Sequence, residues 1–183
     1  MARPGRSGSM ATTRAASGAL ALFLFVSATA RAGCGEEPRL HALDFWLGHW
    51  DVTAGGGPSG KNDIDAILGG CALTEHWLDV QGGAGISLFW YDRSADRWKQ
   101  VWVTEQALLP GGAKEKTEVR ELTSTTQIRF QGRYPGRAPG VFIDDRTTLT
   151  REAPDRVRQL IEVSKDGGKT WVSVFDAEYR RKD

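Results

Sequence analysis

Three polar side chains, Glu75, Gln100 and Gln159, lie in short segments that are otherwise rich in apolar and aromatic residues. Side chains alternate between the two faces of a β-strand, so residues two apart share a face. In the segment 71–80, this rule places Glu75 on the same face as Trp77. A few polar groups that converge among aromatic rings are typical of a small-molecule binding site.

The same alternation extends this candidate site to two further segments. Gln100 shares a face with Trp98 and Trp102, and Gln159 shares a face with Ile161. If these faces point inward, Trp77, Trp90, Trp98 and Trp102 line the interior of the protein. The predicted ligand-binding residues are then Glu75, Trp77, Trp90, Gln100, Trp102 and Gln159.

A filled core is the alternative to a cavity, with each buried amide bonded to a backbone group. Val101 and Val103 also form an apolar face, so the direction in which this strand faces stays open. Two further hypotheses concern function. One is a cofactor-free enzyme that uses Glu75 or His76 as its general base, since burial among tryptophans raises the pKa of a glutamate. The other is a protein-interaction module that binds through its outer face.

The enzyme hypothesis stays uncertain, because the sequence shows no set of nucleophile, base and orienting residue. A metal site is not expected either. The three histidines, His41, His49 and His76, have no ligand spacing among themselves or with Cys34 and Cys71. The sequence therefore predicts no metal and no cofactor, and it names no catalytic residue.

These side chains have to be positioned by β-strands. From Trp50 onward, short segments rich in β-branched and aromatic residues alternate with glycine-rich turns such as 82–85 and 165–169. No segment is long enough for a crossover helix, so we expect an antiparallel meander of about ten strands. Closure into a barrel removes the two free edges of such a sheet. A short helical turn is expected over Leu40–Gly48, before the first strand.

One turn carries a known motif. Ser164–Trp171, SKDGGKTW, reads as an Asp-box, the hairpin that recurs in sialidases and related propellers. A propeller needs several blades of about 40 residues each, and the sequence contains no second Asp-box. We therefore expect a structural turn, in which Asp166 accepts backbone N–H groups and Gly167 and Gly168 adopt positive φ angles.

Residues 1–32 are predicted to be a secretory signal peptide. They contain arginines, then an apolar run over 19–26, and then Ala30-Arg31-Ala32. Residues 33–183 then form one β-barrel domain that is secreted or periplasmic, with no membrane span. Cys34 and Cys71 are predicted to form a disulfide, and a lipid anchor on Cys34 is the lesser alternative.

The charge of the remaining chain argues against a nucleic-acid partner. Cleavage after Ala32 removes four arginines and no acidic residue, leaving 20 basic and 23 acidic residues, a net charge of −3. A chain of this charge offers no basic surface for nucleic acid. The expected partner is a small molecule, and the sequence does not indicate an oligomeric state.

Two resemblances support the barrel. LDFWLGHWDV (Leu43–Val52) and the Asp-box near the end resemble a family of exported bacterial proteins of unknown function. Gly48-His49-Trp50 after a helical turn also resembles the start of calycins, the lipocalin-like and nitrobindin-like barrels. The calycin resemblance implies that Trp50 closes one barrel end and that Arg180 or Arg181 stacks on it. Haem barrels of the nitrobindin kind use a histidine late in the chain, and none follows His76.

Overall fold

The structure is a computed structural model of the chain, and it describes residues 1, 2, 35, 37–105 and 113–182. All described strands lie in the unit Arg31–Asp183. Except for its first two residues, the predicted signal peptide lies outside the described residues, and so does Cys34. The signal peptide, the disulfide with Cys71 and the lipid anchor therefore remain predictions.

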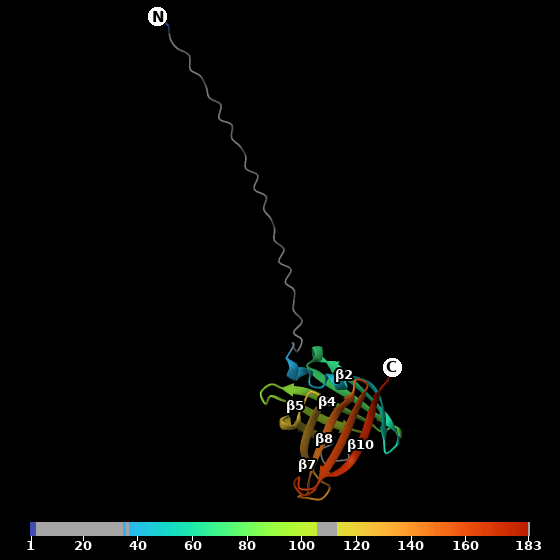
Figure 1. Cartoon of the computed structure of the whole chain (residues 1–183). Helices are drawn as coiled ribbons and strands as arrows, with labels where there is room; N and C mark the ends of the chain where they lie inside the picture. Colours follow the sequence, from blue (N-terminus) through green and yellow to red (C-terminus); the bar gives the residue numbers. More distant parts are fainter. Residues whose placement is uncertain (3–34, 36, 106–112, 183) are drawn as a thin grey trace. The chain divides into compact units, whose positions relative to one another are not determined.

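The described residues form ten strands that close into one antiparallel barrel (Figure 1). Each strand pairs with the next along the chain, and β1 pairs with β10, so the barrel is the predicted meander. The strands are β1 Gly48–Ala54, β2 Gly57–Ile67, β3 Ala72–Asp79, β4 Ala84–Asp92, β5 Arg97–Thr104, β6 Ala113–Glu118, β7 Gln127–Pro135, β8 Phe142–Ala153, β9 Arg156–Ser164 and β10 Val172–Arg181. Closure pairs the first strand with the last, and the shortest pairing among the described strands is that of β6 with β7, at Thr117–Gln131 and Glu118–Phe130.

The helical content of the described chain is limited to 3₁₀ turns: η1 Pro38–His41, η2 Asp44–Trp46, η3 Leu68–Gly70 and η4 Arg120–Leu122. The predicted helical turn over Leu40–Gly48 corresponds to η1 and η2. None of the helical segments among the described residues is of the length and apolar character that a membrane crossing requires.

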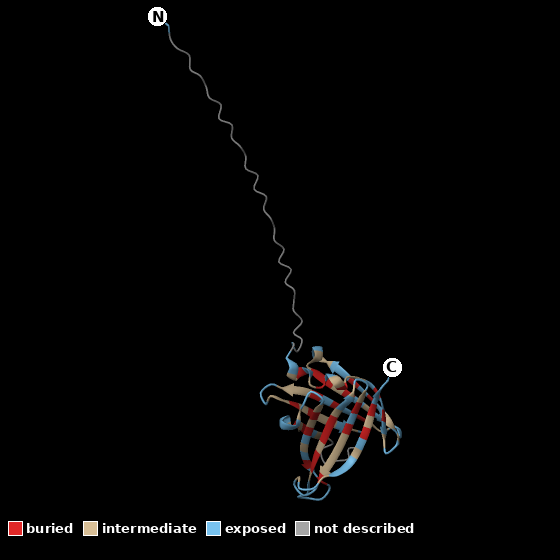
Figure 2. Ribbon diagram, viewed as in Figure 1, coloured by how far each residue is buried: buried red, intermediate tan, exposed pale blue. Residues whose placement is uncertain are grey.

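Buried and exposed residues alternate along most strands, as expected when one face of each strand points into a barrel (Figure 2). In the half of the barrel next to η1 and η2, the inward side chains fill the interior. Trp46 packs edge to face on Phe89, with ring centroids 5.3 Å apart, and Tyr179 contacts both Trp46 and Trp50. This half is therefore a close-packed core.

Turn η1 is fixed to the core by its arginine. Arg39 donates to both carboxylate oxygens of buried Glu118, at 3.0 and 2.8 Å, and Glu118 also accepts the backbone N–H of Trp98 at 3.0 Å. The indole Nε1 of Trp98 in turn donates to the backbone oxygen of Arg39 at 2.7 Å. These hydrogen bonds hold η1 against the barrel and close this end.

The contact implied by the calycin resemblance is present. Trp50 is 1% exposed, and the guanidinium carbon of Arg181 lies 4.4 Å from the centroid of its ring system. Arg181 also donates to the backbone oxygen of Leu47 at 2.6 Å. Gly48 leaves room for this arginine, since a Cβ atom there would overlap the guanidinium group. Of the two candidates, Arg181 makes the stacking contact, whereas Arg180 is exposed and bonds to Glu178.

The Asp-box is the structural turn that the sequence predicts. Asp166 accepts the backbone N–H groups of Lys169 and Thr170 at 3.1 and 2.9 Å, and the Thr170 hydroxyl at 2.6 Å. These hydrogen bonds, the Thr170 hydroxyl first, lower the pKa of Asp166 to about 2. Gly167 and Gly168 have φ angles of 73° and 85°, as expected.

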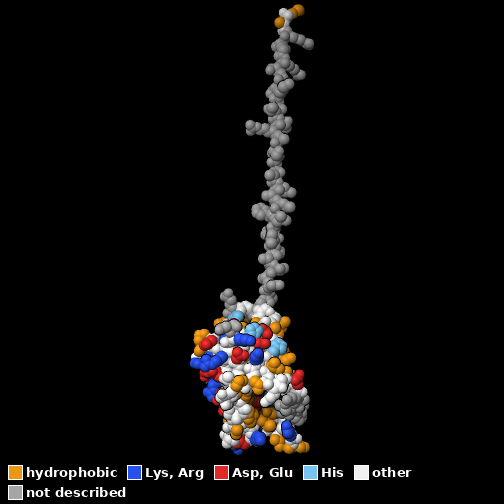
Figure 3. Space-filling model, turned by 90° about the vertical axis from the view of Figure 1, so that its right-hand side faces the viewer, with side chains coloured by type: hydrophobic (Ala, Val, Ile, Leu, Met, Phe, Trp, Pro, Cys, Tyr) orange, Lys and Arg blue, Asp and Glu red, His pale blue; other side chains and the backbone are white. Residues whose placement is uncertain are grey.

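Ion pairs join neighbouring strands on the outer surface of β8, β9 and β10. Arg146 pairs with Glu162 at 2.7 Å, and Arg158 pairs with Asp176 at 2.7 Å. Basic and acidic side chains are mixed on the face that the space-filling view presents (Figure 3).

Candidate functional site

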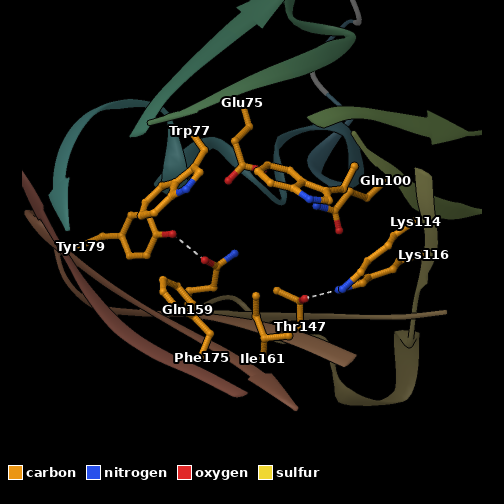
Figure 4. A pocket seen from close by; sticks show the side chains of 11 residues that line it. Glu75, Trp77, Gln100, Lys114, Lys116, Thr147, Gln159, Ile161, Phe175 and Tyr179 are labelled. Atoms are coloured by element: carbon orange, nitrogen blue, oxygen red, sulfur yellow. Dashed lines mark hydrogen bonds between the residues drawn. The ribbon is translucent and has the colours of Figure 1, made fainter. Parts of the chain in front are cut away.

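The half of the barrel away from Trp50 contains a cavity of about 240 Å³ (Figure 4). Inward side chains of β3, β5, β6, β8, β9 and β10 line it: Glu75, Trp77, Gln100, Trp102, Lys114, Lys116, Thr147, Gln159, Ile161, Phe175 and Tyr179. Trp77, Trp102, Ile161 and Phe175 point inward and are nevertheless only half-buried, so solvent reaches this half of the interior.

Five of the six predicted site residues line this cavity, namely Glu75, Trp77, Gln100, Trp102 and Gln159. The prediction for Trp90 is wrong, because Trp90 is half-buried on the outer face and lies opposite Lys99 of β5. Ser87, Phe89 and Tyr91 lie on the inward face of β4. Trp98 does point inward, but it belongs to the filled core and does not line the cavity.

The two tryptophans of the site lie over glycines of neighbouring strands. A Cβ atom on Gly60 of β2 would stand 2.7 Å from the Trp77 ring, and one on Gly85 of β4 would overlap the Trp102 ring. Phe175 meets Trp77 edge to face, with centroids 6.1 Å apart. A glycine inside a strand often marks such a close approach, so Gly60 and Gly85 were signals of the site in the sequence.

Glu75 is 4% exposed and belongs to a hydrogen-bonded network of neutral side chains. One carboxylate oxygen accepts from Asn62 Nδ2 at 2.8 Å and the other from Ser87 Oγ at 2.5 Å. The same Ser87 oxygen accepts from Gln100 Nε2 at 3.0 Å. Burial raises the pKa of Glu75, and the hydrogen bonds from Ser87 and Asn62 oppose this rise only in part.

Two glutamines of the cavity have hydrogen-bonding atoms that are available to a bound molecule. Gln100 is 5% exposed, and its buried Oε1 has no hydrogen-bond partner. Gln159 uses its Oε1 to accept from the Tyr179 hydroxyl at 2.5 Å, and its Nε2 points toward the middle of the cavity (Figure 4). An unpaired buried acceptor costs free energy that a bound molecule can recover.

His76 lies on the other side of the barrel wall. It is exposed and belongs to the outward face of β3, so it cannot act together with Glu75 in the interior. The described residues contain no group of three or more His, Cys, Asp or Glu side chains that could hold a metal ion.

Sequence reasoning missed two lysines on the opposite wall of the cavity. Lys114 and Lys116 share the inward face of β6, and both pair with Asp145 of β8, at 2.9 and 2.5 Å. Lys116 also donates to Thr147 Oγ1 at 2.6 Å. Its side chain is 5% exposed, and that of Asp145 is 0% exposed.

A glycine makes this contact between β6 and β8 possible. Gly132 of β7 lies opposite Asp145, and a Cβ atom on Gly132 would overlap the backbone oxygen of Glu115 in β6 and stand 3.1 Å from Lys116 Cγ. The lysine therefore crosses β7 where that strand has no side chain. Lysine is rarely buried, so Lys114 and Lys116 looked like surface residues, and Gly132 was the only local sign against that.

In this cluster the pKa values of Lys116 and Asp145 are lowered and that of Lys114 is raised. Burial lowers the pKa of Lys116, and the charge of Asp145 offsets only part of this effect. Burial acts to raise the pKa of Asp145, but the charges of Lys116 and Lys114 outweigh it and hold this pKa below its usual value. Asp145 is therefore ionised at neutral pH.

No protein-family model matches this chain, and a search of curated proteins finds no relative. The function is therefore inferred from the cavity and its side chains.

Proposed function

We propose that this protein binds a small, largely apolar or aromatic molecule inside its barrel. The supporting observation is the cavity itself, in which half-buried tryptophan rings face a buried amide oxygen without a partner. The cavity of about 240 Å³ beside Gln100 favours this proposal over a completely filled core. The predicted signal peptide and the resemblance to exported bacterial proteins support a location outside the cytoplasm as part of this proposal.

Filling the cavity tests this proposal. Ile161→Trp adds volume at the cavity wall, and in a filled core such overpacking costs about 1–3 kcal/mol. In a cavity the larger ring has space, so we expect the melting temperature to change by less than about 3 °C. Calorimetric titration with 2-naphthamide, a neutral aromatic probe, should show binding to the wild type and at least tenfold weaker binding to the variant.

His76→Ala is the matched control, because His76 lies on the outer face of the same barrel. It should leave the affinity for 2-naphthamide unchanged. If Ile161→Trp destabilised the protein strongly, or if 2-naphthamide bound equally well to both variants, the barrel interior would not be the binding site.

Glu75→Gln should leave stability at pH 8 unchanged or raise it. Because the pKa of Glu75 is raised by folding, its ionisation costs stability, and this cost grows as the pH rises above the ordinary range near 4.5. Glutamine removes this cost because it carries no charge. The Asn62 Oδ1 atom has no partner in the wild type, and after rotation of the Asn62 amide it can accept from the new glutamine side chain. Thermal melts at pH 4 and pH 8 should show an equal or higher melting temperature for the variant at pH 8, and no gain at pH 4. A lower melting temperature at pH 8 would mean that Glu75 is a structural ion.

A further inference from the structure

We propose that the molecule bound in this cavity carries a carboxylate, which Lys116 and Lys114 hold while the tryptophan wall receives its apolar part. This inference rests on the proposed function, and it names the chemical class of the ligand.

Charge is the first argument. Lys114 and Lys116 share a single carboxylate, that of Asp145, so this wall of the cavity has one more positive than negative group. Glu75 also lines the cavity, and its charge acts on Lys116. It is not in contact with the lysines, because its two oxygens accept from Asn62 and Ser87, and burial opposes its ionisation. A second anion beside the lysines would balance them, and buried charges are stable only when paired.

Hydrogen-bonding capacity is the second argument. An ammonium group has three donors, and among the described residues Lys116 Nζ has two partners, Asp145 and Thr147. Lys116 lines the cavity, and so does Gln159, whose Nε2 points into it (Figure 4). The two oxygens of a carboxylate can accept from these two groups.

The register of the strands indicates where the apolar part of the ligand lies. In the register of β5 with β6, Lys114 lies directly opposite Trp102 and Lys116 directly opposite Gln100. An anion held by the lysines therefore places the rest of the molecule next to Trp102 and under the unpaired Gln100 Oε1. An aromatic or cyclic carboxylate with an N–H or O–H group fits these contacts.

A matched pair of probes tests the inference. 2-Naphthoate and 2-naphthamide have nearly the same shape and differ in charge, so calorimetric titration of both isolates the effect of the carboxylate. We expect 2-naphthoate to bind the wild type at least tenfold more tightly, in line with a charge-assisted hydrogen bond. In Lys116→Met the two affinities should agree within about threefold, because the main cation at the site is gone.

Two further variants complete the experiment. Lys99→Met removes an outer-face lysine of β5 that pairs with Asp92, and it should keep the full preference for 2-naphthoate. Should Lys116→Met fail to fold, the triple variant Lys114→Met, Lys116→Met, Asp145→Asn removes all three charges of the buried cluster and should also lose the preference.

The possible outcomes separate the two proposals. Equal binding of both probes to the wild type, or a preference for 2-naphthoate that survives the loss of Lys116, would overturn the carboxylate inference and leave an apolar cavity standing. If neither probe bound the wild type, the proposed function itself would fail.

Discussion

Replacing Trp50 by alanine should lower the free energy of unfolding by about 3–5 kcal/mol, the range found when large aromatic side chains are removed from a packed core. Trp50 is 1% exposed, donates its Nε1 hydrogen to the backbone oxygen of Trp46 at 3.0 Å, and lies under Arg181. The variant therefore loses the apolar contacts, this hydrogen bond and the cation–π contact together. Thermal denaturation should show a fall in melting temperature of about 6–20 °C.

Trp90→Ala is the matched control, since it removes the same side chain from the outer face. Trp90 is only half-buried, so its loss should cost about 1–2 kcal/mol. Equal losses for the two variants would contradict the assignment of Trp50 to the closed end of the barrel and of Trp90 to its outside.

Asp145→Asn should also destabilise the protein by about 3–5 kcal/mol at pH 7, because it leaves Lys116 buried without its counter-ion. The cost should shrink as the pH rises toward 10.5, the ordinary pKa of lysine. Burial already lowers the pKa of Lys116, and loss of Asp145 lowers it further, so the folded variant loses this proton at lower pH than the unfolded chain does. Urea denaturation at pH 7 and pH 9.5 measures both effects.

Asp144→Asn provides the comparison, since Asp144 neighbours Asp145 in β8 but faces outward. The Asp144 side chain is 13% exposed, but its partner Arg133 is 60% exposed and 3.8 Å away, so the ion pair is weak and its loss should cost less than about 1 kcal/mol at both pH values. A small loss for Asp145→Asn, or one that did not depend on pH, would show that Lys116 finds another partner or solvent.

The sequence alone was sufficient to predict the barrel and most of one cavity wall. Strand alternation placed Glu75, Gln100 and Gln159 on inward faces, and the structure confirms all three. The calycin resemblance pointed to the contact between Trp50 and an arginine near the end of β10. These predictions succeeded because a period of two and glycine-rich turns are local properties of the chain.

Trp90 shows where local patterns become ambiguous. In β4 both faces contain large apolar residues: Ile86, Leu88 and Trp90 on one, Phe89 and Tyr91 on the other. Hydrophobicity alone therefore does not determine which face of β4 points inward. The register with β3 decides, because it sets Ser87 opposite Glu75 and so turns Trp90 outward.

The second wall of the cavity could not be predicted from local sequence, because it forms only when β6, β7 and β8 lie side by side in the sheet. Lys114 and Lys116 meet Asp145 across the whole width of β7, at a glycine, although β6 and β8 are not paired with each other. From local sequence alone a lysine is expected to lie in solvent, since its charge is costly to bury. That cost is met here by a carboxylate 31 and 29 residues further along the chain. The positive side of the site is therefore decided by the tertiary structure, because its charges become partners only when β7 pairs with both β6 and β8.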